Sequence, residues 1–99
     1  MKNPIENLDR IYESRVRLGI MSALMVNEWV DFNTFKELLD TTDGNLASHL
    51  KALEKKEMIS VRKQFIGRKP RTSYNATEKG KKSFQKHLDA LEGIIRNKT

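Results

Sequence analysis

The sequence predicts a mainly α-helical domain with one small β-hairpin, an α+β fold class. Two observations support this prediction. Apolar residues recur at helical spacing before Met58 and after Thr77, whereas between these positions they alternate with polar residues at the period of a β-strand. The turn sequence Gly67-Arg68-Lys69-Pro70-Arg71 divides this alternating stretch. At 99 residues the chain, residues 1–99, is expected to form a single domain.

The N-terminal part predicts two helices. Asn3, Pro4 and Glu6 have the pattern of a helix start, with a cap, a proline at the first helical position and a glutamate three residues after the cap. One apolar face follows, formed by Ile5, Leu8, Ile11 and Tyr12. A second helix is expected from about Ser14 to Val26 because apolar residues recur there at helical spacing. These residues lie on two sides of the helix, so another part of the domain or another subunit should cover it.

A connector and a short helix come next. Residues 29–33 carry β-prone side chains and are expected to form a connector or a brief strand. Asn33 can cap a helix over about residues 34–39, whose inward face would consist of Phe35, Leu38 and Leu39. Residues 40–41 should end this helix.

A further helix should follow directly and run to about Lys56. Thr42 can cap it, and three leucines share one side of it and would anchor it in the core: Leu46, Leu50 and Leu53. Two short helices joined by a turn of two or three residues form a helix-turn-helix, here over about residues 34–56.

The alternating stretch predicts a hairpin over about residues 58–77. In its first strand Ile59, Val61 and Phe65 point one way, whereas Ser60, Arg62 and Gln64 point the other. In the second strand the alternation returns with Thr72, Tyr74 and Ala76. The tip and the strand that leads to it are crowded with cations: Arg62, Lys63, Arg68, Lys69 and Arg71. Such charges repel one another unless a polyanion neutralises them.

The C-terminal part predicts one long helix. Thr77 can cap it, and it should run over about residues 78–97. Its apolar residues are spaced by 4, 3 and 4 positions: Phe84, Leu88, Leu91 and Ile95. This spacing is that of a coiled-coil seam, which one helix cannot satisfy alone, so we expect it to contribute to a dimer.

The net charge of +6 is distributed unevenly along the chain. Residues 1–50 carry 5 basic and 8 acidic side chains, whereas residues 51–86 carry 12 basic and 3 acidic ones. A positive field of this strength on one third of a small domain attracts polyanions.

A helix-turn-helix followed by a β-hairpin is the winged-helix arrangement, flanked here by N- and C-terminal helices suited to dimerisation. In this arrangement the second helix enters the DNA major groove, and the hairpin reaches phosphates or the minor groove. We therefore expect double-stranded DNA as a partner, contacted by the leading end and outward face of the second helix and by the hairpin: Thr42, Asp43, Gly44, Asn45, Ser48, His49, Lys51, Lys55, Arg62, Arg68, Lys69 and Arg71. A solvated helix face is the alternative for the outward lysines and serine.

Other functional classes find little support. The chain has no cysteine, its two histidines are expected at the surface of different helices, and it has no Gly-rich phosphate loop, so we predict neither a metal or cofactor site nor an enzyme. No apolar run is long enough to span a bilayer and no signal peptide is evident, so we expect a cytoplasmic protein without a membrane partner. Trp29 and Phe32 favour core or dimer packing over a pocket for a small effector, whose existence stays open.

These motifs resemble the small winged-helix transcriptional regulators related to the MarR group. The pieces that carry the resemblance are Phe32-Asn33, Lys36-Glu37-Leu38-Leu39, Thr42-Asp43-Gly44-Asn45-Leu46, Ser48-His49-Leu50, Leu53-Glu54, Gly67-Arg68, Pro70-Arg71-Thr72, Tyr74 and Thr77-Glu78-Lys79-Gly80. The resemblance covers about residues 8–92. It implies a homodimer built from the terminal helices, which binds an approximately two-fold symmetric operator. The terminal apolar residues are the candidates for this dimer interface: Leu8, Ile11, Phe84, Leu88, Leu91 and Ile95.

The sequence thus predicts a homodimeric, sequence-specific DNA-binding regulator of transcription. A repressor is favoured over an activator because no separate activating domain is evident. The alternative is a winged-helix module that binds another protein and has no specific affinity for DNA.

Overall fold

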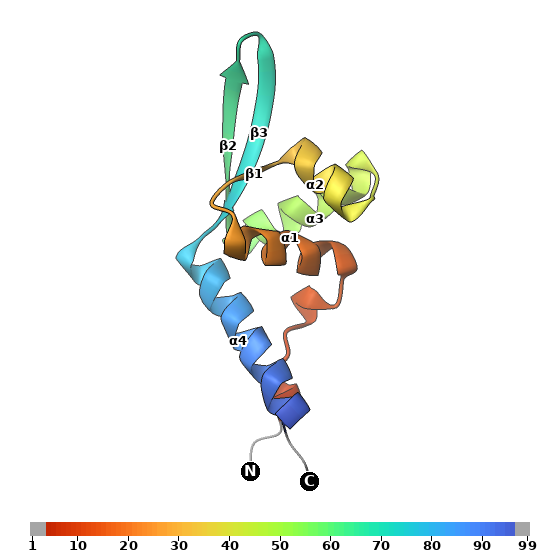
Figure 1. Cartoon of the computed structure of the whole chain (residues 1–99), viewed down its shortest axis with the longest axis vertical. Coiled ribbons are helices and arrows are strands. Elements are labelled where there is room, and N and C mark those ends of the chain that lie inside the picture. Colours follow the sequence, from red (N-terminus) through yellow and green to blue (C-terminus); the bar gives the residue numbers. More distant parts are fainter. Residues whose placement is uncertain (1–3, 97–99) are drawn as a thin grey trace.

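The computed structural model describes residues 4–96 and confirms the α+β fold class (Figure 1). Its elements follow one another in the order η1 (Pro4–Asn7), η2 (Arg10–Tyr12), α1 (Arg15–Val26), β1 (Val30–Asp31), α2 (Phe32–Leu39), α3 (Asp43–Lys55), β2 (Ile59–Ile66), β3 (Lys69–Ala76) and α4 (Glu78–Arg96). Helices α2 and α3 form the helix-turn-helix, and β2 and β3 with their turn form the wing, residues 59–76.

The N-terminal helix prediction is wrong in type. Residues 4–12 form two short 3-10 helices, η1 and η2, and the proposed cap Asn3 lies outside the described residues. The break between the two comes from Asp9, whose backbone is extended and whose carboxylate accepts a hydrogen bond from the Ile11 amide at 2.9 Å. Aspartate favours such local bonds to the backbone over continuing a helix, so Asp9 caps a new turn.

Helix α1 has the predicted bounds, and its neighbour α2 begins earlier than predicted. Ser14 caps α1 by accepting from the Arg17 amide at 3.2 Å. The α2 cap is Asp31 and not Asn33, because the Asp31 carboxylate accepts from the Thr34 amide at 2.7 Å. Leu38, predicted to face inward, is 61% exposed.

The predicted start and inner face of α3 are confirmed. The Thr42 hydroxyl caps the helix by accepting from the Asn45 amide at 3.2 Å. Asp40, in the left-handed conformation, ends α2 just before it. The three leucines of the inner face, Leu46, Leu50 and Leu53, are at most 2% exposed.

The sheet is antiparallel with strand order β1-β3-β2. The turn between β2 and β3 consists of Gly67 and Arg68 alone, so residues 69–71, predicted as turn, belong to β3. Gly67 has φ +65°, the left-handed region that a tight hairpin turn needs and that glycine adopts without strain. Pro70 stands opposite Phe65. In a hairpin closed by two residues this pair is not hydrogen-bonded, so the missing proline N–H costs the ladder nothing.

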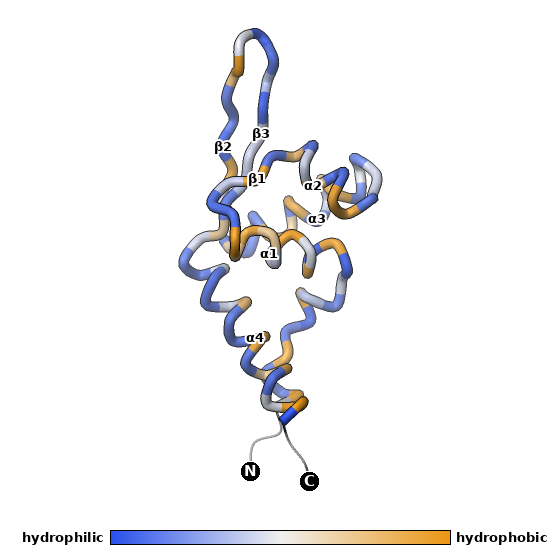
Figure 2. Tube along the Cα trace, viewed as in Figure 1, coloured by the Kyte–Doolittle hydropathy of each residue, from blue (hydrophilic) through white to orange (hydrophobic). Residues whose placement is uncertain are grey.

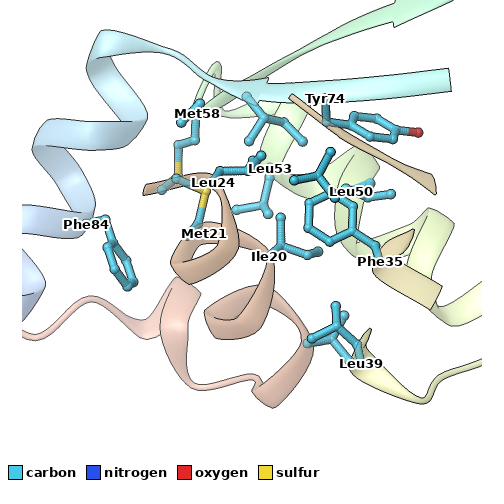
Figure 3. Packing of buried hydrophobic residues seen from close by; sticks show 14 of the residues in the cluster. Ile20, Met21, Leu24, Phe35, Leu39, Leu50, Leu53, Met58, Tyr74 and Phe84 are labelled. Carbon is cyan, nitrogen blue, oxygen red and sulfur yellow. The ribbon is translucent and has the colours of Figure 1, made fainter. Parts of the chain in front are cut away.

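The core lies where α1, α2 and α3 meet the base of the wing (Figure 3). Ile20 and Met21 of α1, together with Phe35 of α2, are fully buried there, and Tyr74 of β3 packs its ring 6.2 Å from that of Phe35. Helix α4 adds Phe84 at the margin of the same cluster. The core therefore fixes the base of the wing against the helix-turn-helix.

The molecule is elongated, with principal extents of 58 × 25 × 22 Å. Figure 1 shows the wing at one end and the last turns of α4 at the other. Within residues 4–96 no helix combines the length and the apolar character needed to cross a membrane.

Candidate nucleic-acid interface

Helix α3, from Gly44 to the acidic Glu54, and one face of the wing are the two walls of an open groove of about 580 Å³. Helix α3 contributes Gly44, Ser48 and Lys51 to it, and the wing contributes Val61, Lys63, Thr72 and Tyr74. The groove is thus built from the two elements that the sequence assigns to DNA contact.

The first turn of α3 presents a bare backbone at the end of this groove. Gly44 is exposed, and a Cβ added to it would meet nothing within 4 Å. Asp43 beside it pairs with Lys36 of α2 at 2.8 Å, and the Asn45 amide group donates to the Thr41 hydroxyl at 2.8 Å. Backbone N–H groups at a helix N-terminus favour anionic ligands, so this end suits a phosphate or a base edge.

The outward face of α3 is as open as its sequence implies, except at its flank. Ser48, Lys51 and Lys55 are exposed. His49 is half-buried, and its Nδ1 lies 2.9 Å from the guanidinium of Arg17 in α1. Arginine can only donate, so Nδ1 accepts. Burial, and to a smaller extent the charge of Arg17, lowers the pKa of His49. This predicted DNA contact is therefore already engaged with the protein's own scaffold.

The wing cations divide between its two faces. Since side chains alternate along a strand, Lys63 shares the groove face with Val61, whereas Arg62 and Arg71 lie on the opposite face. The Arg62 guanidinium stacks 3.9 Å above the Trp29 ring, and its Nε is buried without a hydrogen-bond partner. Arg71 pairs with Asp31 at 3.6 Å.

The Asp31 carboxylate that pairs with Arg71 also accepts hydrogen bonds from Thr34. Hydrogen bonds from Thr34, first from its backbone and then from its side chain, lower the pKa of Asp31, and the charge of Arg71 contributes less. Arg62 and Arg71 thus both brace the root of the wing, whereas Arg68 in the turn and Lys69 are exposed.

Two wing residues of the groove face were not among the predicted DNA contacts. Lys63 lines the groove, and Phe65 lies further out on the same face with 76% of its surface exposed. Their signal was present in the alternation that begins at Ile59, which places every second residue on one face.

The predicted dimer residues also divide. Ile11 and Phe84 are 9% and 3% exposed within the core of the single chain, where the Tyr12 ring packs edge-on against Phe84 at 5.2 Å. Leu8 is half-buried, whereas Leu88 and Leu91 are each 37% exposed and Ile95 is 80% exposed. The exposed three form a stripe along α4 beside its buried face.

The predicted surface position is wrong for His87, whereas His49 is still partly exposed. His87 is 8% exposed, packs 4.6 Å from the Tyr12 ring, and accepts a hydrogen bond from the Asp9 amide at 3.2 Å. It therefore holds the N-terminal segment against α4. Phe32 packs against the core and Arg62 covers Trp29. Over the described part of the chain, no three His, Asp or Glu side chains are grouped so that they could hold a metal ion.

Comparison with known proteins assigns this architecture to a family. Residues 16–95 match the model of the winged helix DNA-binding domain. An uncharacterized protein of Methanocaldococcus jannaschii is 34% identical over 88 residues, which cover 89% of this chain and 96% of that protein. The structure of a transcriptional regulator homologue from Pyrococcus horikoshii superimposes with a TM-score of 0.84 at 32% identity, covering 96% of this chain and 95% of that one.

The likeness to the MarR group is one of fold. A MarR-family transcriptional regulator from Silicibacter pomeroyi shares the fold, with a TM-score of 0.57 at 13% identity over 98% of this chain and 67% of that one. The predicted winged-helix fold is thus shown by both the family model and the solved structures.

Proposed function

The chain belongs to the family of winged helix DNA-binding domains, and from this premise we propose that it binds a specific sequence of double-stranded DNA as a homodimer and represses transcription there. The observation that carries the proposal is the groove between α3 and the wing. Both of its walls present cations, Lys51 from α3 and Lys63 from the wing. A DNA major groove takes an α-helix together with an adjacent element that follows the backbone.

Helix α3 is the candidate for reading bases. Its inner face is fixed by buried leucines, so the exposed Asn45 and Ser48 are presented by a rigid element. Asparagine and serine can hydrogen-bond base edges, whereas Lys51 and Lys55 suit phosphates. Thr42 and Asp43 support this end by capping α3 and by joining it to α2.

The wing is the candidate for holding the backbone. Its 18 residues contain five Lys or Arg and no Asp or Glu. Of these cations, Lys63, Arg68 and Lys69 are exposed and without a counter-charge within the described residues. Phosphate contacts of this kind contribute affinity without reading sequence.

The exposed stripe of α4 supports the homodimer. Leu88, Leu91 and Ile95 would pair with the same residues of a second copy, since a two-fold interface uses one surface patch twice. Two α3 helices would then lie about 34–36 Å apart and enter successive major grooves of one DNA face. We further propose that this dimer acts in the cytoplasm and represses transcription by occupying its operator.

A salt titration of duplex binding tests the proposal. The duplex is one recovered by the wild-type protein from a random-sequence pool, and its affinity should fall linearly with salt on logarithmic axes. Arg68→Ala should weaken binding to every sequence, whereas Asn45→Ala should mainly reduce the preference for the recovered duplex.

The matched control is Lys86→Ala, which removes a cation from α4 away from the groove and should leave the binding unchanged. If the wild-type protein shifts no duplex even at low salt, the proposal fails, and a protein-binding module becomes the better reading.

A further inference from the structure

The outer half of the wing carries apolar surface that the fold does not use. Phe65 is 76% exposed and Ile66 51% exposed, and neither belongs to the core cluster. Figure 2 shows this hydrophobic segment of β2 close to the turn, in the outer part of the hairpin, which is otherwise mostly hydrophilic. Because a phenylalanine in such a place contributes little to stability, its large apolar surface needs another explanation.

Phe65 faces the groove, and Ile66 faces away from it. Val61 and Lys63 line the groove wall, and Phe65 is the next residue of the same alternating series. The strand register places Pro70 directly across from Phe65, as Thr72 lies across from Lys63. An apolar pair, Phe65 and Pro70, therefore extends the groove wall toward the tip, about 13 Å beyond Val61 at the usual rise of a strand.

The charged residues of the wing near this pair are all cationic, although Pro70 also lines a second groove with Asp31. Lys63 precedes the pair on the same face, Arg68 lies in the turn, and Lys69 stands opposite Ile66. An apolar side chain with cations at nearby positions of its hairpin fits a ligand that carries anions at its rims and apolar surface between them. The DNA minor groove, with two rows of phosphates and sugar and base edges between, is such a ligand.

We propose that Phe65 is a wedge that enters the minor groove next to the major groove occupied by α3 and partly unstacks a base step there. This inference rests on the proposed DNA-binding function and deepens it. Adjacent major and minor grooves are about 17 Å apart, half of a 34 Å turn, and the wing carries Phe65 about 13 Å past Val61 in the direction of the neighbouring minor groove. Proteins of many folds insert phenylalanine in this way and bend the duplex.

The wedge would give the protein sequence preference at a position that it does not read by hydrogen bonds. Pyrimidine–purine steps such as TA and CA unstack most easily, whereas A-tracts resist deformation. Operators should therefore carry a flexible step beneath the wing on each side of the dyad. Replacing that step by an A-tract should weaken wild-type binding by about tenfold. The same replacement should leave the affinity of the Phe65→Ala variant nearly unchanged.

The test compares wild-type protein with Phe65→Ala on a duplex selected by the wild-type protein from a random pool. One purine at a time beneath the wing is replaced by 2-aminopurine, whose fluorescence rises when it unstacks, and energy transfer between the duplex ends reports bending. Wild-type protein should raise the fluorescence at one position and shorten the end-to-end distance. Phe65→Ala should abolish both signals at saturating protein and weaken binding by about tenfold, and Phe65→Leu should restore part of each signal.

Two matched variants distinguish the proposed wedge from a general loss of apolar surface or of DNA affinity. Ile66→Ala removes a neighbouring exposed apolar side chain from the opposite face and should leave fluorescence and bending unchanged. Arg68→Ala should lower affinity and the salt dependence, but at saturation the fluorescence should remain. The thermal unfolding midpoints of all variants should match the wild type because each altered side chain is exposed.

Several results would overturn the wedge. Wild-type binding with equal fluorescence and bending in Phe65→Ala would remove it and leave the DNA-binding function standing. Failure of the wild-type protein to bind any duplex would remove both. Phe65-dependent sedimentation with phosphatidylserine vesicles, or a Phe65-dependent oligomer, combined with Phe65-independent DNA signals would assign the tip to a membrane or to a second copy instead.

Discussion

Two glycines stand in the first turns of α3 and α4 for opposite reasons. A Cβ on Gly80 would lie 2.0 Å from the carbonyl oxygen of Met58, a backbone atom that cannot turn away, whereas one on Gly44 would meet nothing within 4 Å. Gly80 is thus required by packing inside the molecule. Gly44 has no such requirement, and the proposed DNA contact would use its bare backbone.

Alanine at each glycine should separate stability from DNA binding. Gly80→Ala should lower the free energy of unfolding by about 1–3 kcal/mol because the overpacked contact forces α4 away from Met58. Gly44→Ala should leave that free energy unchanged or raise it by up to about 1 kcal/mol, since alanine favours a helix, yet it should weaken duplex binding. Denaturant unfolding and duplex titration check both. A destabilised Gly44→Ala would show that this position serves the fold.

A pH dependence is expected from His49. Its pKa is lowered in the folded protein from the ordinary histidine value of 6.5, by burial first and by the charge of Arg17 second. Below that pH the unfolded chain binds a proton that the folded chain resists, so stability should be lost as the pH falls from about 6.5 through the lowered folded value. His49→Asn keeps an acceptor for Arg17 and does not titrate.

The pH prediction is checked by comparing unfolding midpoints at neutral and mildly acidic pH. The decline of the wild type should exceed that of His49→Asn. His87 and the carboxylates are shared by both proteins, so they cancel in this comparison. Equal declines would mean that His49 titrates alike in the folded and unfolded chains.

At the scale of elements, the sequence predicted correctly those helix starts that depend on neighbouring residues alone. Thr42 caps α3 as expected, and α1 begins directly after Ser14, close to its predicted start, because an N-cap depends only on residues within one turn. The prediction of one helix over residues 4–12 was wrong because Asp9 forms a competing local hydrogen bond. The prediction that Leu38 faces inward was wrong because only one narrow side of α2 is covered by the rest of the protein. The division of the wing cations depended on which hairpin face meets α3, and that is decided by tertiary contact with Trp29 and Asp31.

Neighbouring cations on opposite faces of β2 should behave differently. Lys63→Ala should weaken duplex binding and reduce the slope of log affinity against log salt by about 1, as expected for one lost phosphate contact. Arg62→Ala should leave that slope unchanged but lower the unfolding midpoint, because the stacking on Trp29 is lost. Duplex titration over a range of salt gives the slopes. If instead Arg62→Ala reduced the slope and Lys63→Ala did not, the other face of the wing would be the one that contacts DNA.

At the scale of the whole molecule, the fold keeps its two predicted functions at opposite ends. The wing and α3 lie toward one end of the 58 Å axis, and the exposed stripe of α4 reaches the other (Figure 1). The buried His87 and Phe84 hold the N-terminal segment on α4, so this end forms a stable surface that a second copy can meet. A substitution in the α4 stripe can therefore test the proposed pairing of two copies without altering the groove between α3 and the wing.

A charge in the stripe should produce a monomer. Leu88→Glu or Leu91→Glu would bury a carboxylate in a two-fold interface beside its own copy, so sedimentation should show half the mass of the wild type. Duplex affinity should fall by at least about 100-fold as the advantage of two linked sites is lost. Lys82→Glu adds the same group on the far side of α4 and should keep the wild-type mass. Unchanged mass in all three would show that α4 does not pair.

The junction between the wing and α4 has a consequence for how such regulators diversify. The Thr77 amide donates to the Met58 carbonyl at 3.0 Å, the Thr77 hydroxyl donates to the Glu57 carbonyl at 2.7 Å, and the Gly80 amide donates to the Thr77 hydroxyl at 3.0 Å. These bonds set the angle at which α4 leaves the DNA-binding body. In a dimer paired through α4, the same angle sets the number of base pairs between half-sites. Mutation at this junction could therefore create a new operator by altering its spacer, while every residue that reads a base is inherited unchanged.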